Sequence, residues 1–225
     1  MANPCIVSIF MKNINAKTVD MQKKVVEKYN KSKVPHLQVL TDASHSQTME
    51  KITELLGKNG YDAILFLDID AVPVHEDAID YYLQQAYAGK LIGDAQRTNH
   101  IDNNQHVFAA PHAMAFTIET YEKIGKPSFD LTNRGDVAEE LTFKAEERKI
   151  PVELVLPTRY DKEPIKFHWE LDQRPYWALA DGMPNYGIGT TYGNEKGELF
   201  WHLYQIFHPG QQERFWKKCE ELLNG

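Results

Sequence analysis

The sequence predicts an α/β protein with a mixed, mostly parallel central sheet flanked by helices. Short apolar runs of strand length alternate with longer stretches that carry apolar residues at helical spacing, as at Val19, Val25, Val26 and Tyr29. Alternation of this kind indicates βαβ units. The 225 residues, 42% of them hydrophobic and 25% charged, fit a globular chain that buries a substantial core.

The first 90 residues repeat this unit regularly. Apolar runs predict strands at 5–10 and 36–40 and a third strand ending at Asp68, and helices are expected at 18–29, 46–56 and 75–87. Pro35 and Pro73 precede a strand and a helix, and Gly57 and Gly89 lie near two helix ends.

The pattern loosens after Gly89. Strands are expected at 91–93, 108–116 and 151–156, and helices at 119–124, 136–148 and 211–223. Residues 94–105 are strongly polar and predict a loop, and 161–197, rich in Pro, Gly and aromatic residues, predict irregular structure. No linker interrupts the chain, so we expect one domain over 1–225.

Asp68-Ile69-Asp70 is the most informative motif. It ends the apolar run Ala63–Leu67, which has the character of a buried parallel strand. Open α/β sheets bind ligands at the carboxyl ends of their strands, and Mg²⁺ and Mn²⁺ prefer oxygen ligands such as carboxylates. The motif therefore predicts a metal or phosphate site, although two solvated Asp side chains at a strand end would give the same letters.

Bulk properties exclude several classes of protein. No stretch approaches the roughly 18–20 apolar residues that cross a bilayer, and the N-terminus lacks the basic region of a signal peptide. Cys5 and Cys219 are the two cysteines and have no metal-type spacing, so we expect a reducing, cytoplasmic location. A net charge of -7 argues against a non-specific nucleic-acid binder, while a local basic patch leaves a nucleic-acid acceptor open.

The order of elements, with Asp-x-Asp after the third strand, resembles the GT-A class of nucleotide-sugar glycosyltransferases. The resemblance implies a UDP- or GDP-linked sugar donor, an unknown acceptor hydroxyl, and Mn²⁺ or Mg²⁺ that bridges the donor phosphates. Asp70 would be a direct metal ligand and Asp68 a ligand or a partner of the ribose. Residues 1–90 would form the nucleotide-binding half, and 91–225 the half that binds the acceptor and completes the metal shell.

Donor contacts are expected on loops at the same sheet edge. Phe10 and Asn13 leave the first strand, and Asp42 follows the second, where it is equally well explained as a turn residue. Gln96 and Arg97 lie in the polar stretch, and Arg97 offers a planar fork suited to a diphosphate.

The resemblance also implies a late histidine as third metal ligand. His202 is the candidate and His208 the alternative, although a histidine among aromatic residues is often simply a core residue. The glycine-rich segment 187–193 is a weak candidate for wrapping the diphosphate with backbone NH groups.

The predicted helix at 136–148 supplies the candidate general base. In the resembling class an acidic residue at such a helix start takes the proton of the acceptor hydroxyl. Asp136 is the first choice, with Glu139 and Glu140 in reserve. Capping and the helix dipole explain an acidic residue there equally well.

Two other functions remain open. The motif also resembles that of haloacid dehalogenase-type phosphatases, with Asp68 as nucleophile, Asp70 as general acid, and Thr117 with Lys126 or Lys144 as further parts. The second alternative is a non-catalytic nucleotide-sugar-binding protein.

Overall fold

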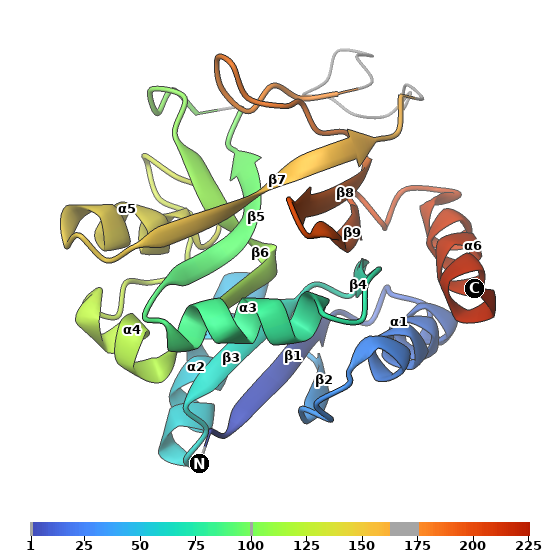
Figure 1. The fold of residues 1–225 in the computed structure, drawn as a ribbon, viewed down its shortest axis with the longest axis horizontal. Coiled ribbons are helices and arrows are strands. Elements are labelled where there is room, and N and C mark those ends of the chain that lie inside the picture. Colours follow the sequence, from blue (N-terminus) through green and yellow to red (C-terminus); the bar gives the residue numbers. More distant parts are fainter. Residues whose placement is uncertain (1, 100, 163–175) are drawn as a thin grey trace.

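A computed structural model describes residues 2–99, 101–162 and 176–225 (Figure 1). The first half repeats strand and helix as expected. Its elements are β1 (Pro4–Phe10), α1 (Ala16–Tyr29), β2 (His36–Leu40), α2 (His45–Lys58), β3 (Ala63–Leu67), β4 (Ala71–Pro73) and α3 (Ala78–Tyr87). Asn15 and Ser44 cap α1 and α2 by accepting backbone N–H bonds, which fixes where both helices begin.

The second half contains more strand than expected. It consists of β5 (Leu91–Arg97), β6 (Val107–Thr117), α4 (Ile118–Lys123), α5 (Glu139–Glu147), β7 (Val152–Tyr160), β8 (Gly189–Asn194), β9 (Gly197–Leu203) and α6 (Gln211–Asn224).

In the described residues the strands form one mixed sheet in the order β2-β1-β3-β6-β5-β7-β8-β9-β4. The α/β prediction is confirmed, and so is the mixed sheet, but "mostly parallel" holds only for the first half. β1 pairs in parallel with β2 and β3, and β5 with β7, whereas the other neighbouring pairs in the described part are antiparallel. The physical reason is short connections: Glu195-Lys196 alone joins β8 to β9, and so short a link permits only an antiparallel hairpin.

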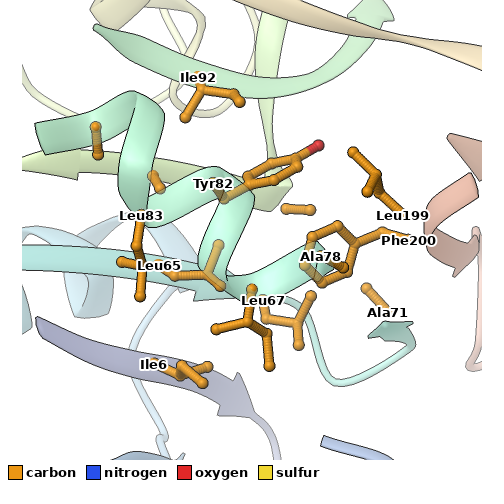
Figure 2. Close-up of a cluster of buried hydrophobic side chains, with 14 of the residues drawn as sticks. Ile6, Leu65, Leu67, Ala71, Ala78, Tyr82, Leu83, Ile92, Leu199 and Phe200 are labelled. Carbon is orange, nitrogen blue, oxygen red and sulfur yellow. The ribbon is translucent and has the colours of Figure 1, made fainter. Parts of the chain in front are cut away.

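Helices cover both faces of the first strands. Side chains of β3 alternate between the two faces, so Leu65 and Leu67 pack under α3 while Ile64 and Phe66 face α2 and Phe129. Figure 2 shows the first of these cores, with Tyr82 of α3 above Leu65 and beside Phe200 of β9. A further core joins α1, α6 and β9.

Three sequence expectations were wrong in detail. The polar stretch 94–105 is not all loop, because β5 continues to Arg97 and Asp94 is fully buried. The glycine-rich segment 187–193 is largely β8, an inner strand whose backbone pairs with β7 and β9. The helix expected at 136–148 begins only at Glu139, because Ala138 takes a left-handed conformation (φ 63°).

Within the described ranges, no helix combines the length and the apolar character that crossing a bilayer requires.

Candidate metal centre and cleft

A cleft of about 310 Å³ opens at the carboxyl ends of β1 and β3. The end of β1, the start of α2, the Asp-x-Asp motif, β5, β6 and the segment after β9 all contribute to its walls. Its lining residues are Ile9, Phe10, Met11, Asn13, Ile14, His45, Asp68, Ile69, Asp70, Gln96, Phe108, Pro111, His112, Asp136, Val137, His202, Tyr204, Gln205, Ile206 and Phe207.

Asp68, Asp70 and His202 come together on one wall of this cleft. One ligand atom from each lies within 4.8 Å of the others, and His202 Nε2 is 3.3 Å from Asp70 Oδ1. Strand pairing explains the meeting of residues so distant in sequence. Ala71 of β4 lies opposite His202 of β9, and Leu203 N donates to the backbone oxygen of Asp70.

The backbone of the motif is held from three sides. Asp68 N donates to His112 O of β6 at 3.0 Å, and Gln22 Nε2 of α1 donates to Asp68 O at 3.0 Å. The turn itself is closed by Ala71 N donating to Asp68 O at 2.9 Å. The two carboxylates are therefore placed by the surrounding strands and by α1.

The electrostatics of this group favour a cation. Burial raises the pKa of Asp70 to about 7 and also raises the pKa of Asp68, because a carboxylate loses its hydration there. Burial lowers the pKa of His202 to about 4, so its imidazole is neutral near pH 7. In the described part of the chain, no Lys or Arg pairs with either aspartate, and the one further ion-pair contact is His45 Nε2, 3.2 Å from Asp68 Oδ1.

The residues present therefore fit a divalent metal. Asp70 is buried and Asp68 is half-buried, and among the described residues neither pairs with a Lys or Arg, so a positive charge nearby would stabilise both carboxylates. Carboxylates suit Mn²⁺ and Mg²⁺, and a neutral imidazole can complete a mixed shell.

Seven of the predicted site residues line the cleft: Phe10, Asn13, Asp68, Asp70, Gln96, Asp136 and His202. Three do not. Asp42 is exposed and pairs with Lys12 at 2.8 Å. Arg97 lies on β5, and its Nε is buried without a hydrogen-bond partner.

Glu139 is the third predicted residue outside the lining. It is fully buried, and each of its carboxylate oxygens accepts two hydrogen bonds. The donors are Thr98, Asn103, His106 and the backbone N–H of Asp136. Glu139 thus ties the start of α5 to the loop after β5. Its reserve, Glu140, is bound to Arg134.

His208, the alternative metal ligand, is outside both the cleft lining and the metal group. Its Nε2 lies 3.1 Å from Gln205 Oε1.

The phosphatase arrangement is not assembled. Thr117 pairs with Ala63, at the opposite end of β3 from Asp68, and its hydroxyl caps α4. Lys126 pairs with Glu122, and Lys144 with Glu147. None of these three residues lines the cleft.

Sequence reasoning missed His45, His112, Tyr204 and Phe207, which all line the cleft. Two of them carried a signal. His45 follows the loop after β2, at the predicted ligand-binding edge, and His112 interrupts an apolar strand. A polar residue inside a buried strand needs a partner, and this requirement points to a site.

No protein-family model matches this chain, and no curated protein matches its sequence. Among solved structures it is similar to Drosophila β-1,4-galactosyltransferase 7 (14% identity, TM-score 0.48, 68% of this chain and 65% of that one), which is also solved with manganese, UDP-Gal and xylobiose. It is also similar to a protein of Desulfovibrio desulfuricans G20 assigned to the nucleotide-diphospho-sugar transferases (13%, 0.44, 69% and 80%).

A third similar structure is 4-diphosphocytidyl-2C-methyl-D-erythritol synthase of Anaerococcus prevotii (14%, 0.45, 68% and 88%).

Proposed function

We propose that this chain is a metal-dependent glycosyltransferase, a hexosyl- or pentosyltransferase, that moves a sugar from a UDP- or GDP-linked donor to an acceptor hydroxyl. The observation that carries this proposal is the group Asp68, Asp70 and His202, gathered within 4.8 Å at the wall of a cleft. The cleft lies where α/β sheets bind nucleotides. We also propose the functional halves 1–90 and 91–225, and a reducing compartment such as the cytoplasm, with Cys5 and Cys219 as buried free thiols.

Asp68, Asp70 and His202 would hold Mn²⁺ or Mg²⁺. When bound, the ion would neutralise the charge that grows on the departing nucleoside diphosphate. The buried carboxylate of Asp70 and the half-buried carboxylate of Asp68 have few hydrogen-bond donors, and this favours binding of a dication.

The donor would lie along the end of β1. Phe10 and Asn13 leave this strand into the cleft, beside Met11, and Gln96 faces them from β5. The Phe10 ring offers an apolar surface for a base, and the amides of Asn13 and Gln96 offer donors and acceptors for sugar hydroxyls. We also propose Asp42 and Arg97 as contacts of the donor. Both lie outside the cleft lining, so their side chains would have to move toward the cleft to reach it.

Asp136 is the proposed general base. It lies in the cleft lining just before α5, and its backbone N–H is bound to Glu139 Oε2 at 2.8 Å. Its carboxylate would accept the proton of the acceptor hydroxyl as that oxygen attacks the anomeric carbon. Glu139, with four donors already bound, would act by positioning Asp136.

The test is release of nucleoside diphosphate from a panel of UDP- and GDP-sugars with Mn²⁺, with and without EDTA. We expect turnover that EDTA abolishes and that Asp70→Asn removes. Asp20→Asn, an exposed aspartate paired with Lys24 on α1, is the matched control and should keep full activity.

Other outcomes assign other functions. Pyrophosphate release from a nucleoside triphosphate and a sugar phosphate would make the chain a nucleotidyltransferase. Hydrolysis of p-nitrophenyl phosphate that Asp68→Asn abolishes would favour the phosphatase. Metal-dependent nucleotide binding without turnover on any acceptor would leave a non-catalytic binding protein.

A further inference from the structure

The imidazole of His202 lacks the usual support of a metal-binding histidine. Such a ring generally donates its second N–H to a carboxylate or a carbonyl, which fixes its orientation. Here Nε2 faces Asp70, while Nδ1 is buried and has no hydrogen-bond partner among the residues that the structure describes. Something other than a hydrogen bond must hold this ring.

Two aromatic rings pack against His202. The ring of His112 is stacked on it, with centroids 4.1 Å apart and planes within 9°, and Tyr204 approaches edge-on at 4.0 Å and 62°. His112 comes from β6, which pairs with β3, and His202 comes from β9, which pairs with β4. The stack therefore joins the two strands that flank the metal group.

A β-bulge brings His112 to this position. In the pairing of β5 with β6, the register shifts between Gly93 and Asp94, which leaves Pro111, His112 and Ala113 without partners on β5. Gly93 permits the close approach, because a Cβ there would lie 2.8 Å from Ala109 Cβ. Bulges often redirect a side chain next to an active site.

His112 is itself held from behind. Its Nε2 lies 3.2 Å from Asp94 Oδ2, without the alignment of a full hydrogen bond, and the other oxygen of Asp94 accepts a hydrogen bond from the Tyr82 hydroxyl. Asp94, Tyr82 and His112 are almost completely buried.

We propose that His112 is a positioning residue for the metal centre: held by Asp94, which in turn accepts a hydrogen bond from Tyr82, its ring holds the His202 imidazole by stacking, so that His202 Nε2 points toward Asp70. In most metal sites a carboxylate or carbonyl accepts a hydrogen bond directly from the metal-binding histidine. Here the carboxylate of Asp94 contacts His112 instead, and His112 stacks on His202. This inference rests on the proposed function, because it requires that His202 binds a cation.

The experiment measures Mn²⁺ affinity of the full chain by electron paramagnetic resonance, with no donor or acceptor present. His112→Gln keeps a polar group toward Asp94 but removes the ring, and we expect about a 10- to 100-fold loss of affinity. His112→Phe keeps a stacking ring, and we expect affinity within about 3-fold of wild type. The Phe variant is made alone and together with Asp94→Asn. The second change removes the carboxylate of Asp94, which would otherwise stay buried without its contact to His112 Nε2.

His106→Gln is the matched control. His106 is stacked on Phe143 in the same manner (3.8 Å, 11°) but does not line the cleft, so its loss should leave Mn²⁺ affinity unchanged. Wild-type affinity in His112→Gln would overturn this inference alone. An equal loss in His112→Gln and both Phe variants would overturn the role of stacking. A wild-type chain that binds no Mn²⁺ would overturn the proposed function and this inference together.

Discussion

Two acidic centres in this molecule, Glu139 and the pair Asp68 and Asp70, differ in how many hydrogen bonds their carboxylate oxygens accept. Glu139 accepts four hydrogen bonds at 2.7–2.8 Å. Asp68 and Asp70 have two histidine contacts between them, at 3.2 and 3.3 Å, and both have a raised pKa. Asp70 is buried like Glu139, so burial does not distinguish these two carboxylates, whereas Asp68 is half-buried.

This difference indicates that Glu139 stabilises the fold, whereas Asp68 and Asp70 are suited to bind a ligand. A buried carboxylate whose acceptors are all used stabilises the segments that supply the donors. A buried carboxylate with few donors destabilises the protein until a ligand compensates it, and such groups concentrate at functional sites. The number of donors around each carboxylate is thus more informative than its place in the sequence.

The largest effect is expected for Asp70→Asn. The change removes a metal ligand, so turnover and Mn²⁺ affinity should each fall by more than about 100-fold. It also removes a buried charge that the metal-free protein compensates poorly, so the melting temperature in EDTA should stay the same or rise. Calorimetry in EDTA and Mn²⁺ titration measure the two effects, and a large drop in metal-free stability would contradict the comparison.

Glu139→Gln should show the opposite pattern. In the wild type, four donors bind the Glu139 carboxylate, and the Gln side chain would place its own N–H₂ donor against two of them. The free energy of unfolding should therefore fall by about 2–4 kcal/mol, while Mn²⁺ affinity is kept. Urea unfolding in EDTA measures this loss. Glu147→Gln, at a carboxylate that is 46% exposed and paired with Arg134 and Lys144, is the control and should leave the free energy of unfolding close to that of wild type. Equal losses in the two variants would remove the distinction drawn here.

Metal addition sharpens the contrast. A ligand that binds the folded state at 100 times its dissociation constant stabilises it by about 2.7 kcal/mol. Wild type and Glu139→Gln should both gain this stability on adding Mn²⁺, and Asp70→Asn should gain none. Thermal shifts with Mn²⁺ and with EDTA decide the point, and a shift in Asp70→Asn equal to that of wild type would place the metal elsewhere.

The first half of the fold was predictable because its signals are local. The strands β1, β2 and β3 are continuous apolar or alternating runs, and α1 and α2 have capping residues and helical spacing. The edge where Asp68 and Asp70 lie follows from the parallel order of these strands. Both halves of the metal motif were therefore accessible to sequence reasoning.

The second half was harder because its strands are stabilised by distant partners. Asp94 and Gln96 make β5 resemble a loop, yet Asp94 is buried against Tyr82 of α3 and His112 of β6. The pairing of β4 with β9, which brings His202 to Asp70, joins segments about 130 residues apart, and no local pattern encodes it. His202 was predicted through the resemblance, whereas His45 and His112 required the three-dimensional arrangement.

The smallest effect tests the same principle on a buried base away from the cleft. His36 Nε2 lies 3.0 Å from Ser8 Oγ, and its Nδ1 is buried without a partner. Burial, with a contribution from Lys23, lowers its pKa to about 4. Between this value and the ordinary 6.5 the unfolded chain binds the proton more tightly, so the stability from the neutral ring is full above pH 6.5 and is lost as the pH falls toward 4.

His36→Gln should therefore reduce the loss of stability between pH 7 and pH 4.5 by about 1–2 kcal/mol relative to wild type. The other buried histidines, His112 and His202, are common to both proteins, so their contributions cancel in the difference. His75→Gln, at an exposed histidine, is measured alongside as the control. Urea unfolding at the two pH values measures the difference. If His36→Gln has the same pH dependence as wild type, burial of a poorly hydrogen-bonded side chain does not disfavour its charged form here. The same effect would then not explain the raised pKa values of Asp68 and Asp70.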